Sequence, residues 1–120
     1  MTWIGTWKNQ YGSLLTITDE AEGRIAGTFR TALRDSSFFG EEVAVAGIHH
    51  GDCINFAFAA TGCAGDSLAS FTGLHRNGRI ETMWFVVSDA IGVSDGPTET
   101  EKRSWPHAVT TNADTFERVA

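Results

Sequence analysis

The stretch Gly5–Ser13 (GTWKNQYGS) says most about the fold of this chain. It is typical of a strand that buries a tryptophan, Trp7, and then enters a tight turn at Tyr11-Gly12. Asn9 and Ser13 stand four residues apart across that turn, so their side chains are expected to converge at one end of a β structure. Small polar groups that converge beside aromatic residues can hydrogen-bond a small neutral heterocycle.

The rest of the chain repeats the strand pattern and gives no helical one. Turn residues separate eight alternating or apolar-rich runs, most of them by links of hairpin length. One of these links contains Asn77-Gly78, a pair favoured in type I′ turns. The eight predicted strands are Ile4–Gln10, Ser13–Asp19, Arg24–Thr31, Glu42–His49, Cys53–Ala60, Leu68–His75, Arg79–Val87 and His107–Val119.

Short links make consecutive strands antiparallel neighbours, which predicts an all-β fold, an eight-stranded antiparallel up-and-down β-barrel. Such a barrel removes exposed sheet edges and leaves an interior for one small ligand. A two-sheet sandwich is the alternative, which the lack of a long Greek-key crossing disfavours. The longer links, 32–41, 61–67 and 88–106, are rich in Ser, Asp, Gly and Thr, and are expected to be surface loops bordering a site.

Composition bounds the class of protein. With 120 residues the chain is expected to be one domain, 1–120, with a core large enough to fold without metal or disulfides. Its formal net charge is −6 and its basic residues are scattered, which argues against nucleic acid or an anionic membrane as partner. No apolar run approaches the roughly 18 residues of a membrane span. The location stays open: secreted if a signal peptide was removed, otherwise cytoplasmic.

Residues of equal parity on a strand share a face, and the apolar parity places polar residues beside aromatic ones. Taken alone, Asn9 and Ser13 are better explained as caps of a hairpin turn. The addition of inward Asp114 and Thr31 favours a ligand cavity, because a buried carboxylate is costly unless it is hydrogen-bonded. The inward sets are Trp7 and Asn9; Ile25, Gly27, Phe29 and Thr31; Ile54, Phe56 and Phe58; Ser67, Ala69, Phe71 and Gly73; Ile80, Thr82, Trp84 and Val86; and Asp114 and Phe116.

The run Arg79–Val87 is apolar on both faces. Its outward residues, Met83, Phe85 and Val87, would lie in water on an isolated barrel, and large exposed apolar patches mark association sites. We therefore expect a homodimer or homotetramer that associates through this strand.

Sequence motifs for catalysis and metal binding are lacking. The four histidines do not have zinc-site spacing, and the adjacent His49 and His50 are expected at the surface. No nucleophile elbow or phosphate-binding glycine loop occurs, so the protein is predicted not to be an enzyme. Cys53 and Cys63 flank a predicted strand that would hold them some 20 Å apart, which argues against an intrachain disulfide and leaves free thiols or an interchain bond.

At this point the sequence resembles the avidin and streptavidin family of biotin-binding proteins, along nearly the whole chain. The first motif is the most specific. The matching segments are Gly5–Ser13, Gly27-Thr28-Phe29 with Thr31, Phe71-Thr72-Gly73, Thr82-Met83-Trp84-Phe85-Val86, Trp105 and Asp114-Thr115-Phe116.

The resemblance implies a non-catalytic protein that holds biotin, with no cofactor, inside the barrel. Asn9 and Ser13 would donate to the ureido oxygen, while Asp114 and Thr31 would accept from the ring nitrogens and Asp114 would orient Asn9. Aromatic residues would enclose the bicyclic ring, Ser67 and the loop after Thr31 would meet the carboxylate, and Trp105 would reach a neighbouring subunit. The implied ligand contacts are Asn9, Ser13, Phe29, Thr31, Leu33, Arg34, Asp35, Phe58, Ser67, Ala69, Phe71, Trp84, Val86, Trp105 and Asp114.

Three positions depart from the family pattern. Phe29 stands where Tyr is usual, Phe58 where Trp is usual and Ala69 where a Thr commonly bonds the ligand sulfur. One hydrogen bond contributes about 0.5–1.5 kcal/mol, so binding is expected to be weaker than in the tightest members. The alternative function is a lipocalin-like carrier of a small apolar ligand, because Gly5-Thr6-Trp7 also fits the start of that barrel family. Such a carrier would have no use for Asp114.

Overall fold

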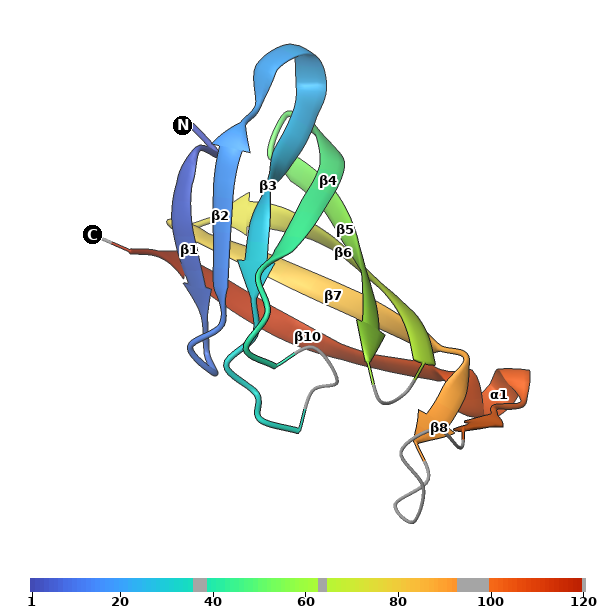
Figure 1. The fold of residues 1–120 in the computed structure, drawn as a ribbon. Coiled ribbons are helices and arrows are strands. Elements are labelled where there is room, and N and C mark those ends of the chain that lie inside the picture. The colour runs from blue at the N-terminus through green and yellow to red at the C-terminus, as the bar shows by residue number, and fades with distance from the viewer. Residues whose placement is uncertain (36–38, 63–64, 93–99, 120) are drawn as a thin grey trace.

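The computed structural model describes residues 1–35, 39–62, 65–92 and 100–119. Its body is a closed barrel of eight antiparallel strands in the order β1-β10-β7-β6-β5-β4-β3-β2, which confirms the predicted up-and-down barrel (Figure 1). A two-stranded sheet, β8 (Ala90–Gly92) with β9 (Thr100–Lys102), lies outside it. The barrel strands are β1 (Gly5–Asn9), β2 (Leu14–Asp19), β3 (Arg24–Arg30), β4 (Val43–His50), β5 (Cys53–Gly62), β6 (Gly65–Arg76), β7 (Arg79–Ser88) and β10 (Val109–Arg118).

Two of the links that were expected to be loops contain regular structure: 61–67, and 88–106, which carries β8, β9 and the start of a short helix. The link 61–67 was expected to be a loop, but β5 and β6 extend through most of it, and Thr61 Oγ1 donates to Asp66 Oδ1 across the pair at 3.1 Å. These two polar residues of the link hydrogen-bond to each other across the two strands, so their polarity did not indicate a loop. The last strand begins at Val109 rather than His107, because a short helix, α1 (Trp105–Ala108), precedes it. Pro106 lacks the N–H that a strand ladder would use and suits the first turn of a helix.

Local backbone features explain how the strands turn and coil. Asn77 and Gly78 both have positive φ, 54° and 76°, as a type I′ turn requires, which confirms the predicted hairpin between β6 and β7. Gly27 lies where β2 and β3 approach closely, since an added Cβ would stand 1.9 Å from Thr16 O. No other residue type fits there without moving the neighbouring strand.

The core follows the predicted period of two. Each inward set is buried or half-buried, and the buried part of the core is mainly aromatic and aliphatic. Trp7, Phe56 and Phe116 are among the largest fully buried side chains, as expected of core residues. The alternation therefore places the same residues inside the barrel that the sequence pattern selects.

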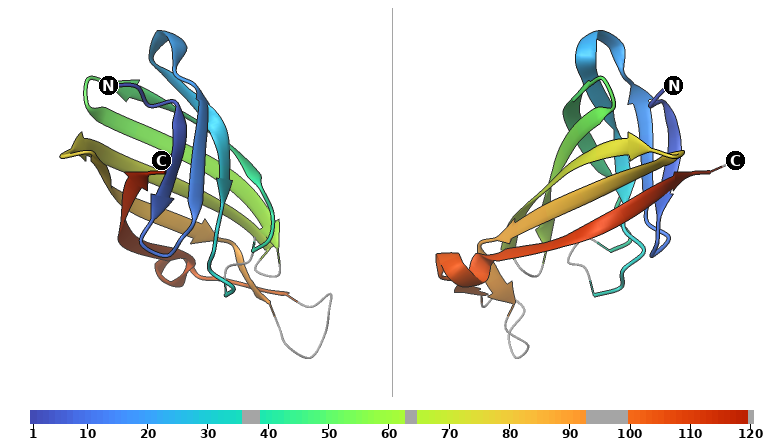
Figure 2. Two further views of the ribbon diagram at one scale, coloured as in Figure 1. Left: turned by 90° about the vertical axis from the view of Figure 1, so that its left-hand side faces the viewer. Right: turned by 180° about the vertical axis from the view of Figure 1, so that it is seen from behind.

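The two ends of the barrel differ, and we name them by their connections (Figures 1 and 2). The loop end carries the β1–β2 turn at residues 10–13 and the β3–β4 connection at 31–42. The hairpin end carries the β2–β3, β4–β5 and β6–β7 turns, and both chain termini lie near it. Within the described residues, no helix is long and apolar enough to cross a membrane.

Candidate functional site

Four polar side chains are buried together at the loop end. Asn9 ends β1, Ser13 immediately precedes β2 and Thr31 immediately follows β3, so three adjacent strands deliver them to the same place. Asp114 comes from β10, the other neighbour of β1. Their exposed fractions are 6% for Asn9, 1% for Ser13, 5% for Thr31 and 6% for Asp114. Four buried polar groups at one point of a barrel are the feature that the sequence predicted there.

Asn9 is held in one orientation by backbone groups of its own turn. Its Oδ1 accepts from Tyr11 N at 3.0 Å and from Ser13 N at 2.9 Å. Its Nδ2 donates to Asp114 Oδ2 at 3.0 Å. Two backbone donors on the oxygen fix which side of the amide is nitrogen, and an amide nitrogen carries two hydrogens. Asn9 therefore has one N–H left for a ligand.

Ser13 and Thr31 each accept a backbone hydrogen bond from the β3–β4 connection. Ser13 Oγ accepts from Ala32 N at 2.9 Å, and Thr31 Oγ1 accepts from Leu33 N at 3.2 Å. A hydroxyl that accepts one bond keeps its own hydrogen and a second lone pair. Ser13 is thus free to donate, and Thr31 is free to accept or donate.

Asp114 is bonded on both carboxylate oxygens and through its backbone. Besides Asn9 on Oδ2, Gln10 Nε2 donates to Oδ1 at 3.2 Å, and the Thr82 hydroxyl donates to the Asp114 carbonyl at 2.8 Å. Each carboxylate oxygen has a second lone pair for a ligand N–H. The predicted contact between Asp114 and Asn9 is present. Gln10 and Thr82 were not among the predicted site residues, although the inward parity of Thr82 pointed to it.

Aromatic rings form a cluster beside the four buried polar residues. The two are linked by β3, which carries Phe29 and is followed directly by Thr31. Phe29 stacks on Phe58 with ring centroids 4.9 Å apart, and Phe71 lies 5.8 Å from Phe29 and 6.5 Å from Trp84. Phe29 and Phe71 are buried, as are Phe58 and Ala69, while Trp84 and Val86 are half-buried. An apolar wall of this kind suits a ring system whose polar edge meets the four buried polar residues.

The remaining predicted contacts lie farther out. Ser67 is 9% exposed and its Oγ lies 3.0 Å from Ser88 Oγ, a partner that the sequence did not single out. Leu33, Arg34 and Asp35 are exposed in the β3–β4 connection. Trp105 is 71% exposed at the start of α1, so within this chain it does not join the aromatic cluster.

The hairpin end is closed by the N-terminal segment. Trp3 is 2% exposed, and its ring centroid lies 6.1 Å from that of His49 and 6.0 Å from that of His75. His49 was expected at the surface but is half-buried, because its Nε2 lies 2.8 Å from Glu20 O and its ring packs on Trp3. Trp7 Nε1 donates to Trp3 O at 2.9 Å. Side-chain hydrogen bonds to backbone carbonyls and ring contacts thus hold Trp3, Trp7 and His49 together at this end.

Glu20 anchors that segment. Its carboxylate accepts from the Thr2 hydroxyl and from Trp3 N, the latter at 2.9 Å. These two hydrogen bonds, first that of Thr2 and then that of Trp3, hold the pKa of Glu20 below its usual 4.5, although partial desolvation opposes them. Arg118 also holds the N-terminal segment: its guanidinium lies 4.2 Å from the Trp7 ring centroid and donates to Ile4 O at 2.8 Å.

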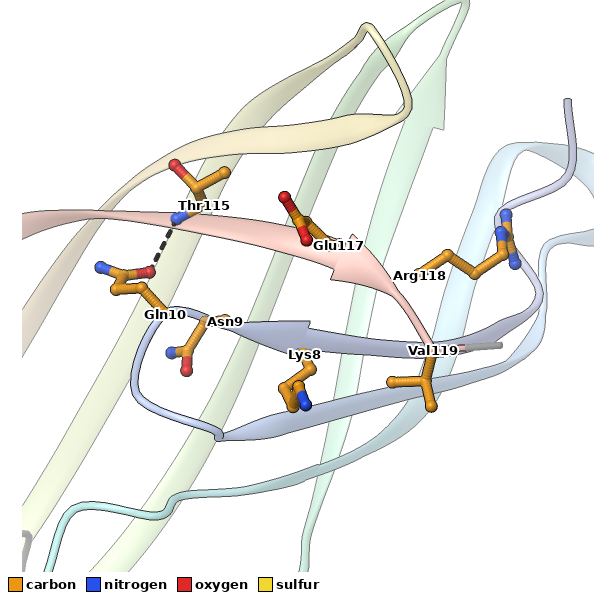
Figure 3. A pocket seen from close by; sticks show the side chains of 7 residues that line it. All are labelled: Lys8, Asn9, Gln10, Thr115, Glu117, Arg118 and Val119. Carbon is orange, nitrogen blue, oxygen red and sulfur yellow. Dashed lines mark hydrogen bonds between the residues drawn. The ribbon is translucent and has the colours of Figure 1, made fainter.

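A hollow of about 410 Å³ runs along β1 and β10 and is lined mostly by outward-facing side chains, although Asn9 of the polar group also lines it (Figure 3). Two of its three charged groups are already engaged: Glu117 pairs with Arg79 at 3.0 Å, and Arg118 binds the N-terminal segment, whereas Lys8 is exposed. We place the candidate site inside the barrel, because Asn9, Ser13, Thr31 and Asp114 are buried together there. Among the described residues no cluster of His, Cys, Asp or Glu could hold a metal ion, and Cys53 is an exposed free thiol; Cys63 lies outside those residues.

Comparison with known proteins agrees with this geometry. The chain resembles bradavidin2 solved in complex with biotin (22% identity, TM-score 0.75, all of both chains) and apo shwanavidin (24%, 0.78, 100% of this chain and 98% of that one). It also resembles core-bradavidin, at 28% identity and a TM-score of 0.73 over 93% of this chain and 96% of that one. None of the curated proteins matches it in sequence. The family model described as "Avidin family" matches residues 1–119, so the chain belongs to the avidin family.

Proposed function

We propose that this protein binds biotin non-covalently in the barrel, with the ureido ring at the four buried polar residues of the loop end, and that it is not an enzyme. The observation that carries the proposal is the hydrogen-bonding capacity left over there. Asn9 and Ser13 each retain a donor, and Asp114 and Thr31 each retain an acceptor. A urea presents one acceptor oxygen between two N–H donors, which is the complementary set.

The site is organised before any ligand binds. Backbone donors hold Asn9, backbone groups hold the two hydroxyls, and Asn9 in turn holds Asp114. Preorganisation of this kind lowers the entropic cost of binding. It supports tight binding of a small rigid head group rather than loose uptake of a flexible apolar chain.

The rest of the ligand would follow the barrel outward. The fused ring would lie against Phe58, Phe71 and Trp84. Ser67 and Ser88 have two hydroxyl hydrogens between them. One forms the hydrogen bond that joins the two residues, so the other is available to the valerate carboxylate. Arg34, exposed in the β3–β4 connection, adds a positive charge at the loop end of the barrel.

We further propose that the affinity lies below that of the tightest family members. Phe29 has no hydroxyl to offer the ureido oxygen, and Ala69 has none for the ligand sulfur. Desthiobiotin, which lacks the sulfur, should therefore bind almost as well as biotin.

Self-association is proposed through the outer face of β6 and β7. Met83 is 56% exposed, Phe85 50% and Leu68 55%, whereas Val87, which was expected to lie in water, is half-buried beside Leu68. Trp105, exposed on α1, would be covered by a neighbouring subunit. Size-exclusion chromatography with light scattering should give a dimer or tetramer that Phe85→Glu converts to a smaller species. A monomeric wild type would refute this part.

Thermal melting and tryptophan fluorescence test the binding proposal. Saturating biotin should raise Tm, because a ligand that binds only the folded state stabilises it, and should quench Trp84. A fatty acid or retinoid should do neither. Unchanged melting with biotin, together with a Tm rise from the apolar ligand, would instead support a lipocalin-like carrier.

A further inference from the structure

Gln10 lies just beyond the last backbone pairing between β1 and β10. β1 pairs with β10 at three positions, the last joining Asn9 and Phe116, and the chain then turns away. Asn9 N donates to Ser13 O and Gly12 N donates to Asn9 O, both at 3.0 Å, so this backbone serves the turn. The next backbone groups of β10 on this side, those of Ala113 and Thr115, need another partner.

The side-chain amide of Gln10 supplies that partner (Figure 3). Its Oε1 accepts from Thr115 N at 3.0 Å, and its Nε2 donates to Ala113 O at 3.2 Å. One acceptor and one donor are what a peptide group of β1 would have offered. Gln10 therefore extends the ladder by one rung although its side chain is exposed.

The same amide also reaches the buried carboxylate between those two residues. Gln10 Nε2 lies 3.2 Å from Asp114 Oδ1, while Asn9 Nδ2 lies 3.0 Å from Asp114 Oδ2. Two consecutive residues thus hold the two oxygens: Asn9, the last residue of β1, from inside the barrel, and Gln10, the first residue of the turn, from outside. A carboxylate held on both oxygens has little freedom to rotate away from a ligand.

We propose that Gln10 is a positioning residue for biotin: from the outer surface it fixes the Asp114 carboxylate in the orientation that accepts the ureido N–H. This inference rests on the proposed function. It explains the residue type, because only an amide offers both an acceptor for Thr115 N and a donor for Ala113 O and Asp114 Oδ1. A glutamate would keep the acceptor, lose the donor and place a second negative charge beside Asp114.

Gln10→Glu and Gln10→Leu separate positioning from support of the strand, with Lys8→Leu as control on the same outer face of the first strand. In calorimetry at pH 7, Gln10→Leu should weaken biotin binding about tenfold and Gln10→Glu at least as much, while Lys8→Leu stays near wild type. Amide exchange of Thr115 should be faster in Gln10→Leu but not in Gln10→Glu, which retains the acceptor. Wild-type affinity in Gln10→Glu would overturn the proposal.

A double-mutant cycle shows whether Gln10 acts through Asp114. In an Asp114→Ala background, Gln10→Leu should cost less than about twofold in biotin affinity, because the group it holds is gone. An undiminished tenfold loss in that background would reduce Gln10 to a structural role and overturn the inference.

A measurement without ligand keeps the inference separate from the proposed function. In the free protein, Asp114→Ala should shift the NMR signals of the Gln10 side-chain NH₂, whereas Asp52→Asn, in the β4–β5 turn at the hairpin end, should leave them in place. If wild type binds no biotin but these signals move, the proposed function fails and the Gln10–Asp114 contact stands. If they do not move, the positioning role is wrong whatever biotin does.

Discussion

The loop end and the hairpin end of this barrel are built on the same strands but use their polar groups differently. At the loop end, Asn9, Ser13, Thr31 and Asp114 are buried and bonded to each other or to backbone, yet each keeps capacity for one more bond. At the hairpin end, Trp3 covers the barrel, and both carboxylate oxygens of Glu20 accept hydrogen bonds from the N-terminal segment that carries it. Unused hydrogen-bonding capacity on side chains that are almost fully buried distinguishes the binding end from the closed end, where Glu20 is only half-buried.

Replacing Asp114 should have the largest effect on binding. Asp114→Ala removes an acceptor for the ligand, leaves the Asn9 amide nitrogen without its partner and takes one of its partners from Gln10. A hydrogen bond to a charged group contributes about 1.5–3 kcal/mol, and unpaired groups add to the loss, so affinity should fall by two orders of magnitude or more. Calorimetry measures it. Glu117→Ala, on the outer face of the same strand, is the control; equal losses in both variants would erase the distinction between inner and outer residues.

Removing the cover of the hairpin end should affect stability instead. Trp3→Ala deletes a side chain that is 2% exposed, and loss of a buried aromatic costs about 3 kcal/mol, a fall in Tm of roughly 10 °C. Biotin affinity of the folded variant should be unchanged, because the closed end lies away from the four polar residues. A large loss of affinity at a temperature where the variant is fully folded would show that the two ends are coupled.

Restoring a hydroxyl at position 29 should strengthen the loop end. Phe29→Tyr adds a donor for the ureido oxygen at a position already stacked on Phe58, so biotin should bind about three- to tenfold more tightly. Competition against desthiobiotin, which keeps the ureido group, should show the same gain for both ligands. No gain for either would mean that the ureido oxygen lies elsewhere.

The smallest effect is a pH-dependent one at the hairpin end. The folded-state pKa of Glu20 is lowered, so its hydrogen bonds stabilise the fold above the unfolded value of about 4.5 and are lost as pH falls through the folded value. Glu20→Gln should lower Tm slightly at pH 7, and the difference from wild type should shrink below pH 4.5. Calorimetric scans between pH 3 and 7 measure this; a difference that grows on acidification would contradict the assignment.

Much of this architecture follows from the sequence because strands have a period of two. Alternation selected the inward residues of each strand, and hairpin-length links set the strand order. Parity also placed Asp114 and Asn9 on inner faces, although they lie 105 positions apart. Their meeting required only that the barrel close between the first and last strands.

Other features depend on contacts that periodicity does not carry. Trp3 precedes the first strand, and its burial depends on Glu20 and the two histidines that it meets. Gln10 is exposed. Its role arises because the backbone pairing of β1 with β10 ends before Thr115, whose N–H then donates to the Gln10 side chain. The helix at Trp105–Ala108 is too short for a helical pattern to show. Registers and chain ends of this kind are set by tertiary structure.

NMR mapping of biotin on the labelled wild-type protein tests the central claim most directly, because it reports both ends in one titration. One equivalent per chain should shift the Asn9 side-chain amide and the Ser13 backbone amide, and leave the indole N–H of Trp3 unmoved. Shifts confined to the hairpin end or to the outer hollow, or none at saturating biotin, would contradict the account.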